Sequence, residues 1–482
     1  MKRTFSQFFG INLDQSQLDF IDITAESDTP LFIDPFALSI RQDSWSERCH
    51  LHITHFFQTA LDNIRAGNHD RARELLNGLS EPNETCLGLS KGRPQGRGVS
   101  GKQALDLHDS LARSQAAQSG LLQELADCDL FVEGIARDKI SDITTNIVRF
   151  LLIEYTQEQC KLHGINLVGT YPTGRYWDID VGEWINSYEP LPIIDGQRII
   201  LVPKYSVRRS LSLNSQEYYS HHILNYIAEE EKAHGSPLVR TLKSGARKVY
   251  KKDLKEKFPF SKEFIARFSE NNPQVLKNYK ELYSKVEGAK GTLRHTDFDE
   301  EFDEYIFAET LIATLDEIPP GRDAADEYHK FMIGALEFIF WPNLIYPRKE
   351  TPIHDGRKRI DITYTNAAVE GFFHRAHSSY QIASTYVMVE CKNYSKDPGN
   401  PELDQLAGRF SINRGKLDIL TYRDTSNYKL ICQRCNDTAG DGRGFILPVG
   451  DVQIREFLEL ISKGYRRAID QRLDILLQKL IS

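Results

Sequence analysis

Apolar and polar residues alternate in the last third of the chain as they do in a short α/β unit. Residues 359–364 (RIDITY) have the period of two that is typical of a β-strand, and 386–389 (YVMV) form the apolar, β-branched approach to a buried strand. Helical periodicity precedes the first strand at 326–340 and follows the second at 400–416, before a further strand at 417–422. This order predicts helix, strand, strand, helix and strand.

The rest of the chain mixes both periods. Strand-like segments at 29–40 and 197–207 stand among long helical ones at 141–162 and 217–233. Asp142, with the polar residues 144–146, predicts a helix start through capping. The final segment, 450–482, is amphipathic with helical spacing, and we expect it to pack on the C-terminal unit or to form the seam of a homodimer.

Pro319, Pro320 and Gly321 cannot continue a helix and mark the clearest boundary. We therefore predict a mixed α/β, helix-rich N-terminal region (1–235), a charged helical connector (236–320) and a C-terminal α/β domain (321–482). A chain of 482 residues is too long for one core, so several domains are expected.

Charged residues fall at the expected strand ends. Asp361 lies in the first strand, and Glu390 and Lys392 follow the apolar part of the second. Since alternate side chains share a face, Glu390 and Lys392 project together and Cys391 turns to the opposite layer. Two carboxylates and a strand carbonyl, here that of Cys391, suit Mg²⁺, and a neighbouring ammonium can orient the attacking water.

These elements and the Asp361…Glu390-x-Lys392 pattern resemble the PD-(D/E)xK, or restriction-endonuclease-like, superfamily, with Mrr-type domains the nearest in character. The resemblance covers the last third of the chain and implies an αβββαβ core, hydrolysis of phosphodiester bonds with Mg²⁺ or Mn²⁺, and DNA as substrate. It also suggests bacterial restriction or anti-phage defence, with the N-terminal region as sensor or specificity unit. The sequence departs from the pattern by an insertion at 371–384.

The resemblance suggests two further site residues. The superfamily often has a glutamate on its first helix, where Glu327 and Glu337 lie ten residues apart and so cannot face the same metal. Glu327 is favoured because it shares helical spacing with Phe331 and Phe338. Gln405 resembles the glutamine that Mrr-type domains carry on the next helix.

Several cations could contact the phosphates of a nucleic acid. Alternatively, Arg409 and Arg414 could be surface residues that add solubility, or could pair with Glu402 and Asp404. The basic segment 240–262 could instead be a solvated helical face, or could pair with the acidic segment 297–305. The candidate contacts are Arg357, Lys358, Arg359, Arg409, Arg414, Lys251 and Lys252.

The composition limits the class of protein. A hydrophobic fraction of 40% and a charged fraction of 27% are those of a globular protein, no apolar run reaches the length of a membrane span, and the net charge is −8. Seven scattered cysteines suit a reducing cytoplasm.

Three weaker patterns remain. Residues 96–102 fit Gly-x-x-x-x-Gly-Lys before a helix expected near Gln103, but Gln103 stands where a magnesium-binding Ser or Thr belongs. His374-x-x-His377 and Cys432-x-x-Cys435 have the residue types of a zinc site, although Cys432 reads as the end of an apolar strand (YKLIC).

Two alternative functions stay open beside DNA cleavage. One is a ribonuclease triggered by infection, and the other is a nucleic-acid-binding module that keeps the fold without turnover. Either could require a partner protein or a phage trigger.

Overall fold

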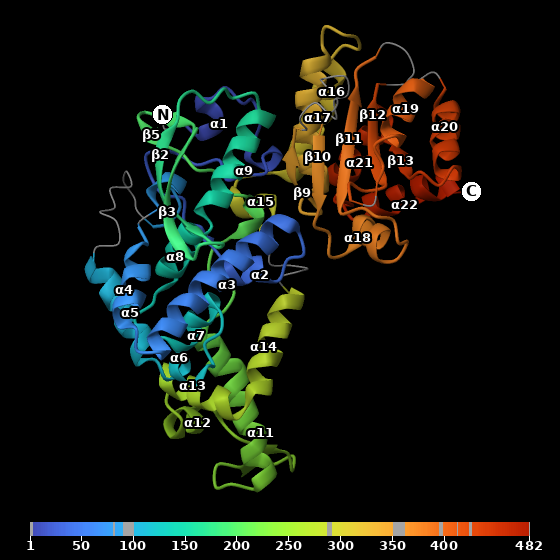
Figure 1. Cartoon of the computed structure of the whole chain (residues 1–482). Coiled ribbons are helices and arrows are strands. Elements are labelled where there is room, and N and C mark those ends of the chain that lie inside the picture. The colour runs from blue at the N-terminus through green and yellow to red at the C-terminus, as the bar shows by residue number, and fades with distance from the viewer. Residues whose placement is uncertain are drawn as a thin grey trace.

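The computed structural model describes residues 3–80, 82–89, 101–286, 292–349, 362–394, 399–411, 413–423 and 427–481, except for the side chains of 101–103, 286, 400–402 and 405. It is a mixed α/β protein built on two hydrophobic cores. Figure 1 shows an elongated N-terminal unit beside a C-terminal unit that contains a five-stranded sheet.

The N-terminal unit is mostly helical. Its long helix α3 (Ser44–Arg65) begins where the Asp43 side chain accepts a hydrogen bond from the Ser46 amide. The apolar face of α3 is buried in the first core. The other helices before residue 165 are α1 (Phe5–Phe8), α2 (Pro35–Ser39), α4 (His69–Asn77), α5 (Gly101–Arg113), α6 (Gln115–Ser119), α7 (Cys128–Phe131), α8 (Arg137–Ile147) and α9 (Arg149–Leu162).

Short strands and a helical arm complete this unit. The two-stranded sheets pair β1 (Phe32–Ile33) with β6 (Val207–Arg208), β2 (Tyr171–Asp178) with β3 (Glu183–Glu189), β4 (Ile193–Ile194) with β5 (Gln197–Arg198), and β7 (Arg240–Thr241) with β8 (Arg247–Lys248). The arm comprises α10 (Ser215–Glu217), the π-helix η5 (Tyr218–Ile223), α11 (Leu224–His234), α12 (Lys251–Lys257), α13 (Lys262–Asn271) and α14 (Pro273–Val286), and α15 (His295–Phe298) follows. In Figure 1, α11 and α12 lie at the end remote from the C-terminal unit.

The C-terminal unit is organised around one mixed sheet. Its strand order is β13-β12-β11-β10-β9, in which β9, β10 and β11 are antiparallel and β11, β12 and β13 are parallel. The strands are β9 (Leu344–Arg348), β10 (Ile362–Asn366), β11 (Tyr386–Lys392), β12 (Leu417–Tyr422) and β13 (Phe445–Pro448). The strand β11, with neighbours on both sides, is therefore central.

Helices cover both faces of this sheet. On one face Tyr364 of β10 donates its hydroxyl hydrogen bond to the Ile333 carbonyl of α17. On the opposite face, Arg409, which follows α19, contacts Glu390. Helices α20 and α22 pack against each other and against β13, and Figure 1 shows α20 at the β13 edge of the sheet. The helices are α16 (Glu304–Glu317), α17 (Ala325–Phe340), α18 (Gly371–Ser378), α19 (Asn400–Ala407), α20 (Tyr428–Gly440), α21 (Asp451–Ser462) and α22 (Ala468–Ile481).

The cores divide the chain differently from the sequence prediction. Helices α12, α13 and α14 contribute to the first core, whereas α16 contributes Ala308, Leu311 and Leu315 to the second. The predicted connector 236–320 is thus shared between the two cores. Its boundary at Gly321 falls between α16 and α17, both of which belong to the C-terminal unit.

Several local predictions also change. The segment 428–432, predicted as a strand, is the start of α20, and the insertion 371–384 contains α18. Asp142 lies within α8, which begins at Arg137, so this polar group does not start a helix. The predicted C-terminal helix is divided into α21 and α22, and both bury apolar residues in the second core.

A buried polar cluster joins the two units. Asp19 accepts hydrogen bonds from the Tyr155 hydroxyl at 2.7 Å and from the Tyr346 amide of β9 at 3.0 Å. Beside it, Nζ of Lys204 lies 3.3 Å from Oε1 of Glu337 on α17, and both side chains are at most 1% exposed. The cluster therefore connects Asp19 and Lys204 of the N-terminal unit with β9 and α17 of the C-terminal unit.

All seven cysteines are free thiols. Within the described ranges, no helix has both the length and the apolar character needed to cross a membrane.

Candidate active site on the central strand

The predicted Glu390 and Lys392 side chains meet at the end of β11. Nζ of Lys392 donates a hydrogen bond to Oε1 of Glu390 at 2.6 Å, so the two side chains share a face of the sheet as their spacing predicts. The side chains are 3% and 14% exposed. An ordinary surface ion pair on an edge strand would be exposed, and this pair is buried on the central strand.

Arg409 is a second cationic partner of the same carboxylate. Its Nη1 donates to Oε2 of Glu390 at 2.8 Å, and its side chain is only 3% exposed. The sequence prediction placed Arg409 on the surface, as a phosphate contact or a partner of Glu402 and Asp404. The structure instead places it two residues after α19, against Glu390, where two cations surround one carboxylate.

Cys391 lies between the two site residues and turns to the other face. Its side chain is half-buried and packs against the second core, on the face that α17 covers. Burial and the nearby Cys391 both raise the pKa of Tyr364, whose ring lies on that face. Alternation along β11 therefore separates Cys391 from Glu390, as predicted.

Asp361 lies outside the described residues, as do Arg357, Lys358 and Arg359. Ile362, which follows Asp361 in the sequence, pairs antiparallel with Val389, which precedes Glu390. In the described ranges, no three His, Cys, Asp or Glu side chains are grouped to hold a metal ion. The backbone of Gln405 is in α19, but its side chain is outside the described part.

The two glutamates of α17 have different surroundings. Glu327 is exposed in the first turn of the helix, although it has the same helical spacing as the buried Phe331 and Phe338. It makes no hydrogen bond or ion pair with the described residues. Glu337 is buried at the junction, where desolvation raises its pKa to about 8. Since α17 covers the face opposite Glu390, the structure does not bring either glutamate into contact with Glu390 among the residues described.

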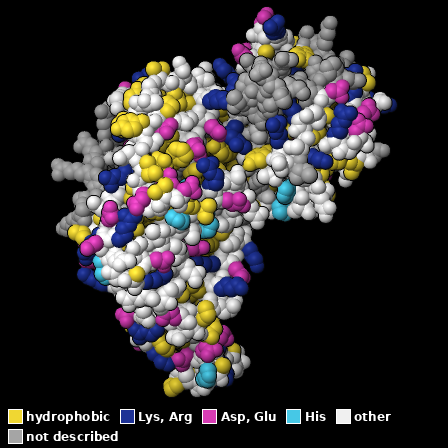
Figure 2. All heavy atoms as spheres, in the orientation of Figure 1, with side chains coloured by type: hydrophobic (Ala, Val, Ile, Leu, Met, Phe, Trp, Pro, Cys, Tyr) yellow, Lys and Arg dark blue, Asp and Glu magenta, His cyan; other side chains and the backbone are white. Residues whose placement is uncertain are grey.

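The predicted basic contacts are dispersed. Arg414 is exposed in the turn before β12, and Lys251 and Lys252 are exposed at the start of α12, in the remote arm. Figure 2 shows acidic and basic side chains interspersed over the visible face of the N-terminal unit.

The acidic and basic segments do not pair with each other in the described part of the chain. The basic segment forms ion pairs from Arg240 to Asp253 and from Lys257 to Glu231. The acidic segment pairs with Arg209, Arg294 and Arg466. The ion pairs described for each segment are therefore made with residues other than those of the opposite segment.

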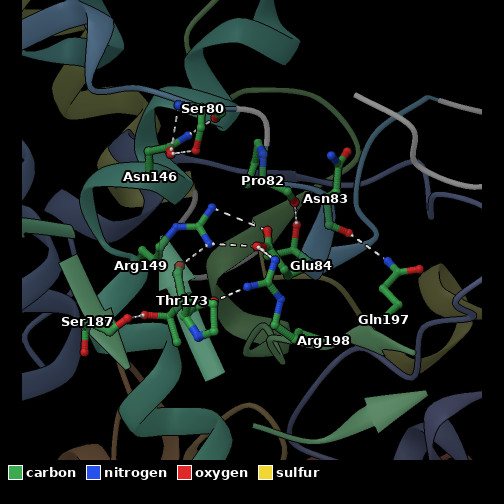
Figure 3. Close-up of polar contacts among 12 residues, drawn as sticks. Ser80, Pro82, Asn83, Glu84, Asn146, Arg149, Thr173, Ser187, Gln197 and Arg198 are labelled. Atoms are coloured by element: carbon green, nitrogen blue, oxygen red, sulfur yellow. Dashed lines mark hydrogen bonds and ion pairs between the residues drawn. The ribbon is translucent and has the colours of Figure 1, made fainter. Parts of the chain in front are cut away.

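The sequence prediction did not include a buried arginine network in the N-terminal unit (Figure 3). Arg149 is 3% exposed, its Nη1 lies 3.2 Å from Oε1 of Glu84, and the same nitrogen donates to the Thr173 carbonyl at 3.0 Å. Arg198 approaches Glu84 from the other side at 3.7 Å. The available signal was a single arginine within the apolar run NIVRFLLI. This network ties α9 to β2 and to the segment around Glu84.

The remaining motifs are also located. His374 and His377 lie on α18, and Cys432 and Cys435 lie on α20, which is a helix rather than the predicted strand. Helix α5 begins at Gly101, close to the start expected near Gln103, and most of the Gly96–Lys102 loop lies outside the described residues.

Comparisons with known proteins gave one family match and one partial relative. Residues 10–214 match the model of a family described only as a domain of unknown function (DUF8370). A segment of 112 residues, 23% of this chain, is 30% identical to a putative transposon gamma-delta 80.3 kDa protein of Escherichia coli (strain K12). The match spans 16% of that relative's length. No solved structure matches the chain.

Proposed function

We propose that the C-terminal unit is a Mg²⁺-dependent endonuclease that hydrolyses phosphodiester bonds of DNA. The observation that carries this proposal is the buried Glu390–Lys392 pair on a central strand, with its 2.6 Å contact. The flanking order of helix, antiparallel strands, helix and parallel strand supports it, because this is the arrangement that the superfamily resemblance implies.

The described residues fit a hard cation in part. Glu390 offers carboxylate oxygens and Cys391 offers a main-chain carbonyl, but Lys392 and Arg409 already bring two positive charges to one negative charge. A divalent ion therefore requires a second carboxylate, and we assign that role to Asp361. When bound, Mg²⁺ would polarise a phosphoryl oxygen and acidify a water ligand. Lys392 would orient the attacking water, while Arg409 would keep Glu390 in position.

DNA is the substrate that the superfamily resemblance implies. A role in restriction or anti-phage defence, with the N-terminal unit as sensor or specificity unit, remains part of the proposal. Protection of a bacterial host against a panel of phages tests this role separately from cleavage. A full-length protein that cuts DNA and protects against none would refute the defence role alone.

Cleavage of supercoiled plasmid tests the chemistry. Wild type is compared with Lys392→Met, in which Arg409 still pairs with Glu390, and with Lys463→Met, which removes a surface lysine 3.1 Å from Glu459. We expect Mg²⁺-dependent nicking by wild type and Lys463→Met, and a loss of about a hundredfold or more in Lys392→Met. Equal cleavage by all three proteins would exclude Lys392 from catalysis. Cleavage of RNA but not DNA would overturn the substrate assignment, and cleavage of neither would overturn the nuclease.

A further inference from the structure

A cavity of about 400 Å³ lies at the junction of the two units, away from Glu390. Ile40 and Arg41, which follow α2, line it from the N-terminal unit, and His374 and His377 of α18 line it from the C-terminal unit. Figure 1 shows α2 and α18 facing each other across the junction. Its volume is within the range of sites for small organic ligands.

The two histidines present complementary hydrogen-bonding groups. Nδ1 of His374 lies 3.2 Å from the Ala368 carbonyl and therefore carries a proton, whereas Nδ1 of His377 accepts from the Ser384 amide at 3.4 Å. In their neutral forms, Nε2 of His377 is thus a donor and Nε2 of His374 an acceptor. Neither Nε2 has a partner among the described residues.

Arginines give the same cavity a positive wall. Nε of Arg41 donates to Asp43 at 2.9 Å, and the guanidinium lies over the Tyr205 ring. The outer nitrogens of Arg41 have no hydrogen-bond partner in the described part of the chain. Arg208 adds a second guanidinium, which donates to the Tyr205 carbonyl at 3.1 Å. Asp43 lies on the same wall and forms an ion pair with Arg41.

The other part of the wall is apolar and comes from Ala367, Ala368, Val369 and Pro342. A cavity with a cationic end, an apolar wall and both a donor and an acceptor suits an organic anion with a ring and a hydroxyl or amino group. We propose that it binds a mononucleotide. The phosphate would contact Arg41 and Nε2 of His377, and a ligand hydroxyl or amino group would donate to Nε2 of His374.

This site is distinct from the proposed nuclease site, and its test does not require cleavage. Because residues of both units form the wall, an occupied cavity would favour the arrangement in which the units are in contact. The proposal therefore also predicts that the nucleotide protects the native protein against thermal unfolding.

Isothermal titration of the full chain with AMP, CMP, GMP and UMP, each separately, tests the proposal. The variants are His377→Ala and Arg41→Met. The control is His234→Ala, which removes a histidine that is exposed in the remote arm. At least one nucleotide should bind wild type and His234→Ala with equal affinity. It should bind His377→Ala and Arg41→Met about tenfold more weakly, since each of these variants loses a hydrogen bond to the charged phosphate.

Three results would overturn the assignment. The first is no binding of any of the four nucleotides at about 1 mM, the weak limit of specific recognition. The second is unchanged affinity in both Arg41→Met and His377→Ala while their unfolding temperatures match that of wild type. The third is equal affinity for inorganic phosphate, which would leave an anion site with no recognition of the nucleoside.

Discussion

The buried Glu337 gives the sharpest test of the junction between the units. Its Oε1 lies 3.3 Å from Lys204, and its side chain is 1% exposed. Burial raises the pKa of Glu337 from 4.5 to about 8 and lowers the pKa of Lys204. Both groups are shifted toward their neutral forms, because desolvation outweighs their attraction. The perturbation is Glu337→Gln, which keeps the shape and removes the titrating proton.

The sign and size of the effect follow from proton binding. Between pH 4.5 and about 8 the folded protein retains the Glu337 proton, whereas the unfolded chain has released it. The folded state binds more protons, so the free energy of unfolding falls as pH rises through this window. Each pH unit contributes at most about 1.4 kcal/mol, and from about pH 5 to about pH 7 we expect a loss of about 2 kcal/mol that Glu337→Gln lacks.

Urea unfolding at both pH values measures the difference. The control is Glu327→Gln on the same helix, where the side chain is exposed. Relative to wild type, Glu337→Gln should gain about 2 kcal/mol between the two pH values, while Glu327→Gln should gain nothing. If the difference between Glu337→Gln and wild type is independent of pH, then Glu337 is ionised in the folded protein and the reasoning fails.

Three further predictions concern other buried groups. Arg149→Met leaves Glu84 without its buried partner and should lower the free energy of unfolding by about 3 kcal/mol in urea, whereas Arg198→Met, at the half-exposed partner, should cost under about 1 kcal/mol. Arg409→Met should lower the unfolding temperature, and saturating Mg²⁺ should recover part of the loss only if Glu390 binds the ion; equal recovery in a Glu390→Gln, Arg409→Met double variant would contradict this. Thiol titration of the native protein should label the two half-buried cysteines, Cys391 and Cys432, well before the five buried ones, and uniform labelling would refute the packing.

Long periodic elements were predictable from the sequence, and short apolar runs were not. Helix α17 and strands β11 and β12 form where the helical and alternating patterns predict them. The prediction of a strand at 428–432 was wrong. Ile431, Cys435 and Thr438, at helical spacing, are buried in α20, and Asn427 caps its start. A five-residue apolar run fits either period, and tertiary packing decides between them.

The candidate site shows the same limit. The contact of Glu390 with Lys392 follows from a spacing of two within one strand, which the sequence gives directly. The contact with Arg409 depends on the turn after α19, and the contact of Arg149 with Glu84 joins distant segments of the chain. Neither follows from a local period, so burial of these arginines had to be seen in the fold.

Strand β9 gives the N-terminal unit a direct mechanical connection to the candidate site. Leu344 of this strand belongs to the second core, whereas Ile345 and Tyr346 belong to the first. The Asp19 carboxylate holds the Tyr346 amide, so the N-terminal unit fixes the position of this edge strand. Strand β9 pairs with β10, and β10 pairs with β11 immediately before Glu390. Two strand pairings therefore connect β9 with the candidate site. Asp19 is therefore a point at which the N-terminal unit holds the edge of this sheet.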